Sequence, residues 1–298
     1  MQVAEELWIY AIEDGVKVHE SGRTGLSVLE NEQARRFVTA RTACISLSAG
    51  TSATRATRST LRVAFLSDIH ANLPALQNAL ADAERRGAGA FVVAGDVVGD
   101  GPHPVEVIGV LLERKIPAIR GNVDRKVLDV DKTALLRQLI GVAEQRQHAW
   151  TARQLGPTER EWLEALPAER NLDYEGVTVR VVHGSPRGDT DYVYPSITGR
   201  GLRSKLGEDR PQVLVCGHSH IPFTRRITGV RVINCGSVGR PADGDSRGSY
   251  ALADLVEGRA PRARIVRFAY PVASLVRALK ERGVPGAEPE QYRRGVKR

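Results

Sequence analysis

From Val63 onward, short apolar runs alternate with helical patterns of about ten residues. The runs VAFLS and AFVVA each lead into a polar loop, and the helical patterns ALQNALADAERR and VEVIGVLLER follow those loops. A short third run, IPAIR, comes next. Strands that alternate with helices of this length form βαβ units, in which the strands are parallel. The pattern therefore predicts an α/β fold built around a parallel sheet.

The alternation is interrupted at residues 125–170, where helical segments predict a small insert over one end of the sheet. After this insert, we expect a hairpin over RRITGVRVINC and strands at 176–182, 212–216, 248–254 and 261–268. A last helix, PVASLVRALKERG, ends near Gly283, a residue type that commonly caps helices. We therefore expect one folded domain over residues 63–283.

The two ends of the chain differ in composition from this domain. Residues 33–62 hold six arginines, many Ser, Thr and Ala residues, and no carboxylate. Such a segment buries little apolar surface. We expect residues 1–62 to form a poorly ordered N-terminal extension and residues 284–298 to form a basic C-terminal tail.

The net charge of +8 raises the question of nucleic-acid binding. Residues 271–298 contribute +4 and residues 1–62 contribute +1, which leaves +3 for the region between them. A basic terminal segment therefore explains the charge better than a nucleic-acid groove.

No apolar stretch approaches the roughly 18 residues of a membrane span. Because the three cysteines are not closely paired, we expect a soluble, cytoplasmic protein without a disulfide framework.

Polar residues gather where the predicted strands end. The loops are SDIH, GD, GNVD, HG and GHSH, and each follows an apolar run. Active sites of open α/β sheets lie at the carboxyl ends of the strands. Carboxylate, amide and imidazole groups together suit two divalent cations that share one carboxylate. The candidate metal ligands in these loops are Asp68, His70, Asp96, Asn122, His183, His218 and His220.

Each of these residues also has a structural interpretation when it is taken alone. Asp68 could cap the following helix, Asp96 could stabilise a glycine turn, and Asn122 could be a turn residue. His183 could be a hydrogen-bonded loop histidine. We favour a metal centre because all five loops occur together, in order, at strand ends.

In its order of DxH, GDxxG, GNxD, HG and GHSH motifs, the chain resembles the calcineurin-like metallophosphoesterases from about Val63 to the last helix. The stretches SDIHANLPAL, HGSPRGDTDYVYP and GSVGRPADGD resemble the small prokaryotic phosphodiesterase branch of that family. The resemblance implies a four-layer α/β/β/α sandwich of two mixed sheets. It also implies a dinuclear metal site at the carboxyl edges of those sheets.

The resemblance assigns a role to each candidate ligand. The first metal would be held by Asp68, His70, Asp96 and His220. The second metal, with Asp96 as the bridge, would be held by Asp96, Asn122, His183 and His218. Catalytic roles are implied for Asp96, Asn122 and His183. Two divalent ions would activate a bridging hydroxide that attacks phosphorus. Mn²⁺ is the preferred candidate, and Fe, Zn, Co or Ni are the alternatives.

One position departs from the wider family. Many members carry histidine where this chain has Val123, and valine can neither donate a proton nor bind phosphate. A phosphomonoester with a poor leaving group depends most on such an acid. We therefore expect a phosphodiesterase, and we expect its substrate to be a small phosphate ester such as a nucleotide.

Other residues are candidates for less direct roles. Asp124 would orient a metal ligand from outside or stabilise its turn. Substrate contacts are predicted at Asn72, Arg125, Arg240 and His103. The two arginines could instead be solvated surface residues. His103 is a candidate for the acid that replaces the missing histidine, but it could instead be a structural loop histidine. The insert at residues 125–170 is the expected site of substrate selection.

Two other functions remain open at this point. One is a non-catalytic metal-binding scaffold. The presence of every expected metal ligand argues against it. The other is a nuclease, to which the nearly neutral central region gives little support, or its milder form, a hydrolase of a dinucleotide or cyclic-nucleotide diester. Homodimers are common among related small enzymes, although no stretch of this chain marks an interface.

Overall fold

Two mixed β-sheets face each other in the computed structural model, which describes residues 7–12, 15–20, 60–130, 142–174 and 176–296. One sheet has four strands in the order β11-β10-β3-β4, and the other has five in the order β5-β6-β7-β9-β8. The strands of the first sheet are β3 (Leu61–Leu66), β4 (Ala90–Val93), β10 (Gly248–Leu255) and β11 (Arg262–Phe268). Those of the second are β5 (Glu169–Tyr174), β6 (Val177–Val182), β7 (Val213–Cys216), β8 (Phe223–Ile227) and β9 (Val230–Asn234).

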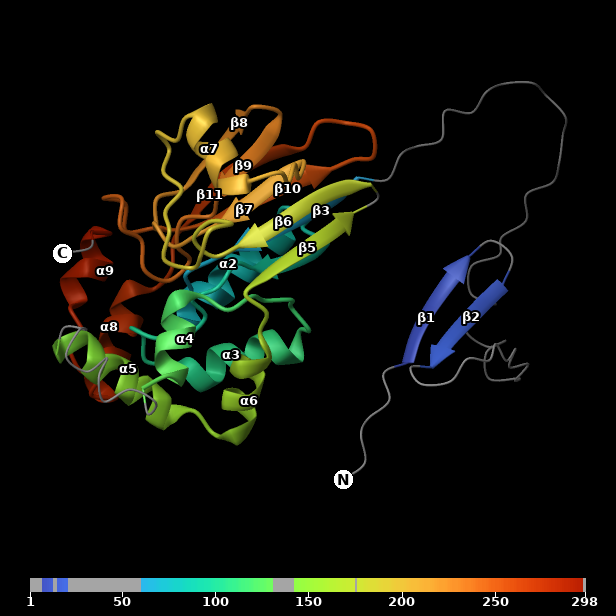
Figure 1. Ribbon diagram of the computed structural model, residues 1–298. Coiled ribbons are helices and arrows are strands. Elements are labelled where there is room, and N and C mark those ends of the chain that lie inside the picture. The colour runs from blue at the N-terminus through green and yellow to red at the C-terminus, as the bar shows by residue number, and fades with distance from the viewer. Residues whose placement is uncertain (1–6, 13–14, 21–59, 131–141, 175, 297–298) are drawn as a thin grey trace, which may run out of the picture. The chain divides into compact units, whose positions relative to one another are not determined.

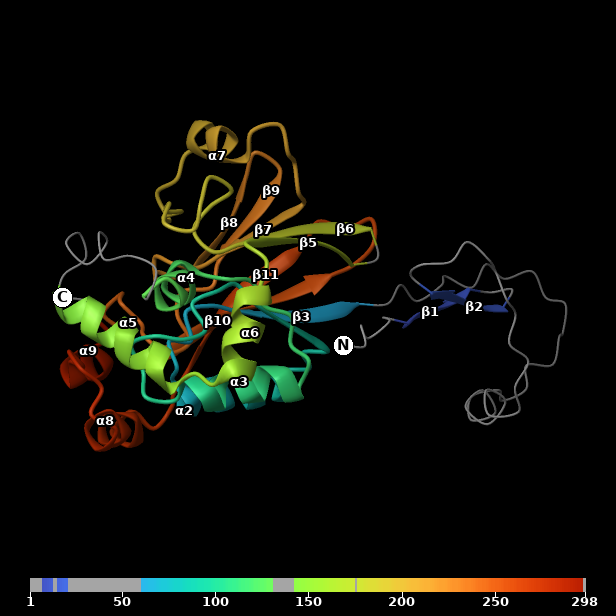
Figure 2. The ribbon, with the colours of Figure 1, turned by 60° about the horizontal axis from the view of Figure 1, so that its bottom comes forward.

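Helices cover the outer face of each sheet, so that the domain has four layers (Figures 1 and 2). The helices are α2 (Leu73–Arg85), α3 (Pro104–Glu113), α4 (Asn122–Leu128), α5 (Val142–Gln154), α6 (Pro157–Ala165), α7 (Gly199–Leu206), α8 (Val272–Glu281) and α9 (Pro289–Arg294). Apolar residues of α2, α3 and α8 pack on the four-stranded sheet, while α7 packs on the five-stranded sheet. The expected α/β/β/α sandwich is confirmed.

The residues of β3 show why its apolar run is continuous. Val63 and Phe65 belong to the core between the two sheets, whereas Ala64 and Leu66 belong to the core beneath the helices. Successive side chains of a strand point to opposite faces, so a strand covered on both faces needs apolar residues throughout. The strand pairs with β4 in parallel, as the alternating pattern predicts.

The first segment of the chain forms a unit of its own, Met1–Ala56. Within it, β1 (Leu7–Ile12) and β2 (Gly15–Glu20) pair as an antiparallel hairpin. The rest of this segment, where we expect an extension, lies outside the described residues. The domain itself begins slightly earlier than expected, because β3 starts at Leu61.

Several elements differ from those expected. The run IPAIR forms no strand, since Ala118 makes only an isolated bridge to Val93. The polar strand β5 and the helix α7 have no clear signal in the sequence. The expected loose C-terminal tail instead includes helix α9, whose Tyr292 is only 3% exposed. Burial of this aromatic side chain holds the helix on the domain.

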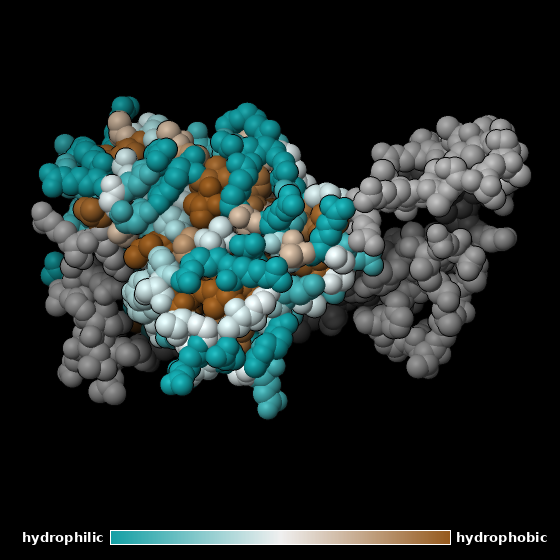
Figure 3. All heavy atoms as spheres, turned by 90° about the horizontal axis from the view of Figure 1, so that it is seen from above, coloured by the Kyte–Doolittle hydropathy of each residue, from teal (hydrophilic) through white to brown (hydrophobic). Residues whose placement is uncertain are grey.

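The helices that the structure describes include none that is long and apolar enough to cross a membrane. On the face drawn in Figure 3, hydrophobic residues lie in separate areas between hydrophilic side chains.

Candidate metal centre

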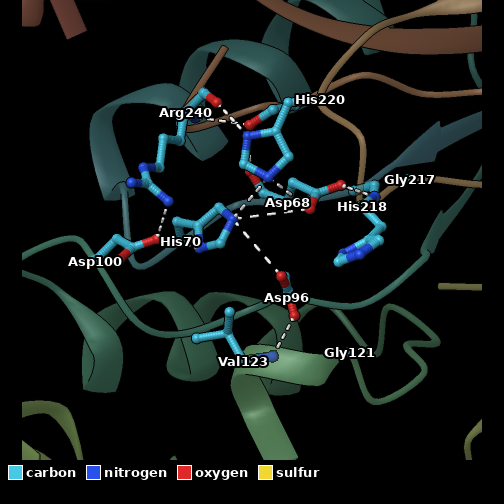
Figure 4. A network of polar contacts seen from close by, with 12 residues as sticks. Asp68, His70, Asp96, Asp100, Gly121, Val123, Gly217, His218, His220 and Arg240 are labelled. Carbon is cyan, nitrogen blue, oxygen red and sulfur yellow. Dashed lines mark hydrogen bonds and ion pairs between the residues drawn. The ribbon is translucent and has the colours of Figure 1, made fainter. Parts of the chain in front are cut away.

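Loops at the carboxyl ends of strands from both sheets bring the seven candidate ligands together. Figure 4 labels Asp68, His70, Asp96, His218 and His220 among them. Asp68 and His70 follow β3, Asp96 follows β4, Asn122 begins α4, His183 follows β6, and His218 and His220 follow β7. These strands lie next to one another in parallel pairs, β3 with β4 and β6 with β7. The edge that the sequence predicts is therefore where the side chains meet.

The first group consists of Asp68, His70 and His220. The Nε2 atoms of His70 and His220 lie 3.2 Å apart. Asp68 Oδ1 is 3.1 Å from His220 Nε2 and 3.7 Å from His70 Nε2. Ligand atoms that each lie about 2.0–2.2 Å from a common ion have separations of this order.

The second group consists of Asp96, His183 and His218, with Asn122 beside them. His183 Nε2 lies 3.3 Å from Asp96 Oδ2 and 3.0 Å from Asn122 Oδ1. Asp96 Oδ2 is also 3.7 Å from His70 Nε2 in the first group. One carboxylate oxygen thus lies between the two groups.

The outer nitrogens of three histidines lie beside oxygen atoms that favour one tautomer of each ring. Nδ1 of His70 lies 3.0 Å from a carboxylate oxygen of Asp100. Nδ1 of His183 lies 2.8 Å from the backbone carbonyl of Ala94, and Nδ1 of His220 contacts the carbonyl of Arg240. A proton on Nδ1 leaves a lone pair on Nε2. The three lone pairs therefore point into the centre, as metal coordination requires.

Three buried polar atoms of the centre have no hydrogen-bond partner among the described residues: Asp68 Oδ1, His218 Nε2 and His70 Nδ1, the last of which has only its ion-pair contact with Asp100. An unsatisfied buried polar group costs about 1–3 kcal/mol. Divalent cations would satisfy Asp68 Oδ1 and His218 Nε2, and the mixture of carboxylate, imidazole and amide donors suits a borderline transition metal. The residues present therefore fit two ions.

Buried charges in the centre perturb its titrating groups strongly. Burial alone would lower the pKa of His183, but the charge of Asp96 outweighs it and raises the pKa to about 10. Burial is likewise outweighed at His70, where Asp100, Asp68 and Asp96 raise the pKa to about 9. The carboxylates thus stabilise positive charge at this point of the fold, and a metal cation can supply that charge in place of protons.

Two glycines allow the ligand loops to approach closely. A Cβ atom on Gly121 would lie 2.1 Å from Asp96 Oδ1, and one on Gly217 would lie 2.3 Å from Asp68 Oδ2. Asp124 holds the same loops from behind, because its carboxylate accepts hydrogen bonds from the backbone N–H groups of Val98 and Gly121. It acts on the backbone of the loops, not on a ligand side chain.

A pocket of about 420 Å³ opens at the centre. Of the four predicted substrate contacts, Arg240 lines it. Asn72 is fully buried and caps α2 by accepting from the N–H of Ala75. Arg125 forms a two-pronged ion pair with Asp189, and His103 is at the N-cap position of α3. The structure does not place these three side chains on the pocket wall.

The sequence analysis missed several residues of the pocket wall: Asp100, Lys126, Gln147, His148, Thr190 and Tyr192. Asp100 has a signal in the sequence, since it shares the loop of Asp96 and lies four positions after it. Lys126, Gln147 and His148 belong to the insert that was expected to select the substrate. Thr190 and Tyr192 lie in the stretch HGSPRGDTDYVYP, for which the sequence indicates a resemblance but no role for either residue.

Comparison with known proteins identifies the class. Residues 61–258 match the model of the calcineurin-like phosphoesterase superfamily domain, which covers most of the chain. The chain therefore belongs to this superfamily, and it is a metal-dependent phosphoric ester hydrolase.

Individual relatives agree with this assignment. An uncharacterized protein of Methanocaldococcus jannaschii is 26% identical over 240 residues, which cover 75% of this chain and 93% of that protein. Phosphodiesterase YfcE of Escherichia coli is 27% identical over 208 residues, which cover 65% of this chain and 88% of YfcE. The crystal structure of a metallophosphoesterase from Sphaerobacter thermophilus superposes with a TM-score of 0.65 at 27% identity, over 80% of this chain and 100% of that one.

Proposed function

We propose that the chain is a phosphodiesterase that uses two divalent metal ions. One ion would be held by Asp68, His70, Asp96 and His220, and the other by Asp96, Asn122, His183 and His218. The proposal depends above all on Asp96 Oδ2, which lies 3.7 Å from His70 Nε2 and 3.3 Å from His183 Nε2. An oxygen between two ligand groups is what a bridging carboxylate requires.

Two divalent ions, when bound, would supply a hydroxide nucleophile near neutral pH and would offset the negative charge of the phosphoryl group. The chain's own residues hold the ligands ready for this task. Asp96 Oδ1 accepts a hydrogen bond from the N–H of Val123 at 2.8 Å, which leaves Oδ2 for the metals. The Ala94 carbonyl keeps the proton of His183 on Nδ1, so that Nε2 stays available. Asp96, Asn122 and His183 are the proposed catalytic residues.

The preference for diesters rests on Val123. This side chain lines the pocket and is 8% exposed, so the position faces the reacting groups but offers no proton. A diester, which carries one negative charge less than a monoester dianion, depends less on such a donor. The similarity to a protein named phosphodiesterase supports the same choice.

The remaining assignments are part of the proposal. Mn²⁺ is the proposed ion, with Fe, Zn, Co and Ni as alternatives, because the ligand types suit all of them. The substrate is a small phosphate ester, and the protein works in the cytoplasm, where free buried thiols such as Cys216 and Cys235 stay reduced. A homodimer is expected by analogy with related small enzymes. The complete set of ligands argues against a non-catalytic scaffold.

Hydrolysis of bis(p-nitrophenyl) phosphate and p-nitrophenyl phosphate by metal-stripped protein, with Mn²⁺ added back, tests the proposal. We expect Mn²⁺-dependent turnover that favours the diester and is abolished in Asp96→Asn. Asp82→Asn is the matched control, because Asp82 is also a largely buried carboxylate but pairs with Arg86 away from the centre. Faster hydrolysis of the monoester would make the protein a phosphatase. Absence of turnover with two ions bound per chain would favour the scaffold.

A further inference from the structure

Two tyrosines are exposed beside the candidate metal centre, and the proposed reaction uses neither of them. The exposed large hydrophobic side chains of the described residues include Leu112, Tyr192, Tyr194 and Val296. Tyr192 is 41% exposed and lines the pocket that holds the candidate ligands, and Tyr194 is 42% exposed. Aromatic side chains exposed together at a polar pocket indicate a surface that binds a flat, partly apolar group.

The tyrosine rings form a stack that begins at a candidate metal ligand. The ring centroid of Tyr192 lies 4.4 Å from that of His218, with 29° between the planes. The centroid of Tyr194 lies 5.2 Å from that of Tyr192, with only 8° between the planes. Tyr192 thus contacts both His218 and Tyr194, and the exposed parts of the two tyrosine rings offer a surface that a further ring can cover.

The backbone around the aromatic stack is fixed on both sides. Val193, between the two tyrosines, is fully buried, so its neighbours point the other way, toward solvent. The carbonyl of Val193 accepts from Asn234 Nδ2 at 3.2 Å, and the carbonyl of Tyr194 accepts from the N–H of Ile197 at 3.0 Å. A platform held in this way loses little entropy when a ligand binds.

We propose that the aromatic stack binds the nucleobase of a nucleotide phosphodiester whose phosphate lies at the metal centre. This inference rests on the proposed phosphodiesterase function and specifies its substrate class. Every nucleobase has a flat π-face that stacks on tyrosine, whereas the alcohol of a glycerophosphodiester has none. The pocket of about 420 Å³ is within the usual range for small-molecule sites. Thr190 on its wall offers a hydroxyl group to the sugar.

Binding of thymidine 5′-phosphate to the full-length, Mn²⁺-loaded protein, measured by calorimetry, tests this subsite directly. Methyl phosphate serves as the ligand without a base. Loss of one stacking partner should weaken nucleotide binding by about 5- to 150-fold. We expect Tyr194→Ala to show this loss, measured relative to methyl phosphate, and Tyr194→Phe to stay close to the wild type. Leu112→Ala, which removes an equally exposed side chain from α3, should change neither affinity.

A kinetic comparison separates the subsite from the function itself. Thymidine 5′-(p-nitrophenyl) phosphate and methyl p-nitrophenyl phosphate are diesters with the same leaving group, and only the first has a nucleobase. Tyr194→Ala should lower the ratio of their kcat/KM values, chiefly through KM. If both are hydrolysed and neither this ratio nor the affinity for thymidine 5′-phosphate changes, the inference is overturned while the phosphodiesterase function stands. If neither diester is hydrolysed, that function fails, and the binding comparison still decides the subsite.

Discussion

Replacing Asp100 by alanine should weaken metal binding, although Asp100 is not one of the candidate ligands. Its Oδ2 atom lies 3.0 Å from Nδ1 of His70 and accepts a hydrogen bond from Arg240 at 2.7 Å. The Asp100 side chain is only 7% exposed, so water replaces it poorly. Without this acceptor, the His70 ring is free to turn or to carry its proton on Nε2, the atom that faces the centre.

Loss of such an outer partner lowers metal affinity by about 10- to 100-fold, which corresponds to about 1.4–2.8 kcal/mol. Only one of the two proposed ions has His70 as a ligand, so calorimetric titration with Mn²⁺ should show one weakened site and one nearly unchanged site. Asp100→Asn keeps one acceptor oxygen but places an NH₂ group near one of the two donors. We expect its Mn²⁺ affinity to lie between those of the wild type and Asp100→Ala.

The control for this experiment is Asp82→Asn. The Asp82 carboxylate accepts hydrogen bonds from Arg86 at 2.7 Å and from the Tyr250 hydroxyl at 2.9 Å. Its loss removes a comparable polar network without touching a candidate ligand, so both Mn²⁺ affinities should be unchanged. Wild-type Mn²⁺ affinity in a folded Asp100→Ala protein would refute the positioning role, and so would an equal loss in the two variants.

Three further predictions concern the pocket, the loops and the pH dependence of stability. Val123→His should raise turnover of p-nitrophenyl phosphate more than that of the diester, and a gain confined to diesters would contradict our interpretation of the valine. Gly217→Ala places a Cβ atom 2.3 Å from Asp68 Oδ2, so thermal unfolding should show a loss of about 1–3 kcal/mol, whereas Gly109→Ala, with open space around its Cβ, should show none. At Asp82, burial raises the pKa, but hydrogen bonds from its arginine and tyrosine partners outweigh burial and lower it below the ordinary 3.8. Its ionisation therefore stabilises the fold above pH 3.8, and this contribution is lost as the pH falls through the lowered pKa. Urea unfolding between pH 6 and 3 should show a weaker acid dependence for Asp82→Asn, and an identical dependence would refute the assignment.

Most of the sheet framework was predictable because buried strands have a recognisable apolar pattern in the local sequence. Strand β3 is covered on both faces and reads as an unbroken apolar run, and the hairpin of β8 and β9 reads as two β segments around Thr228-Gly229. Strand β5 has no such apolar pattern. Its sequence, ERNLDY, lies at the edge of the second sheet, where much of the strand stays partly exposed. Polar residues are tolerated there, so the apolar pattern is lost.

The candidate ligands were predictable because each follows an apolar run, but the residues that support them were not. Asp100 reaches His70 across a loop, and Arg240 reaches Asp100 from a segment that is 140 positions away in the sequence. Helix α9 adds Gln291, which accepts a hydrogen bond from Arg240 at 3.0 Å. Contacts between such distant segments depend on the packed fold, and no local pattern encodes them. The same holds for the stack of Tyr192 on His218.

The backbone of the centre explains why the loops form one unit. Five candidate ligands have positive φ angles between 48° and 62°: Asp68, His70, Asp96, His218 and His220. Each such residue costs of order 1 kcal/mol, and this conformation persists only where the surroundings enforce it. The β3 loop is held in this way, because the N–H groups of Asp68 and His70 donate to the carbonyls of Gly95 and Asp96, both at 3.0 Å. The loop that follows β3 is thus shaped by the loop that follows β4. These hydrogen bonds already hold the strained backbone in the folded chain. Metal binding therefore has to order little of the backbone and costs little conformational entropy.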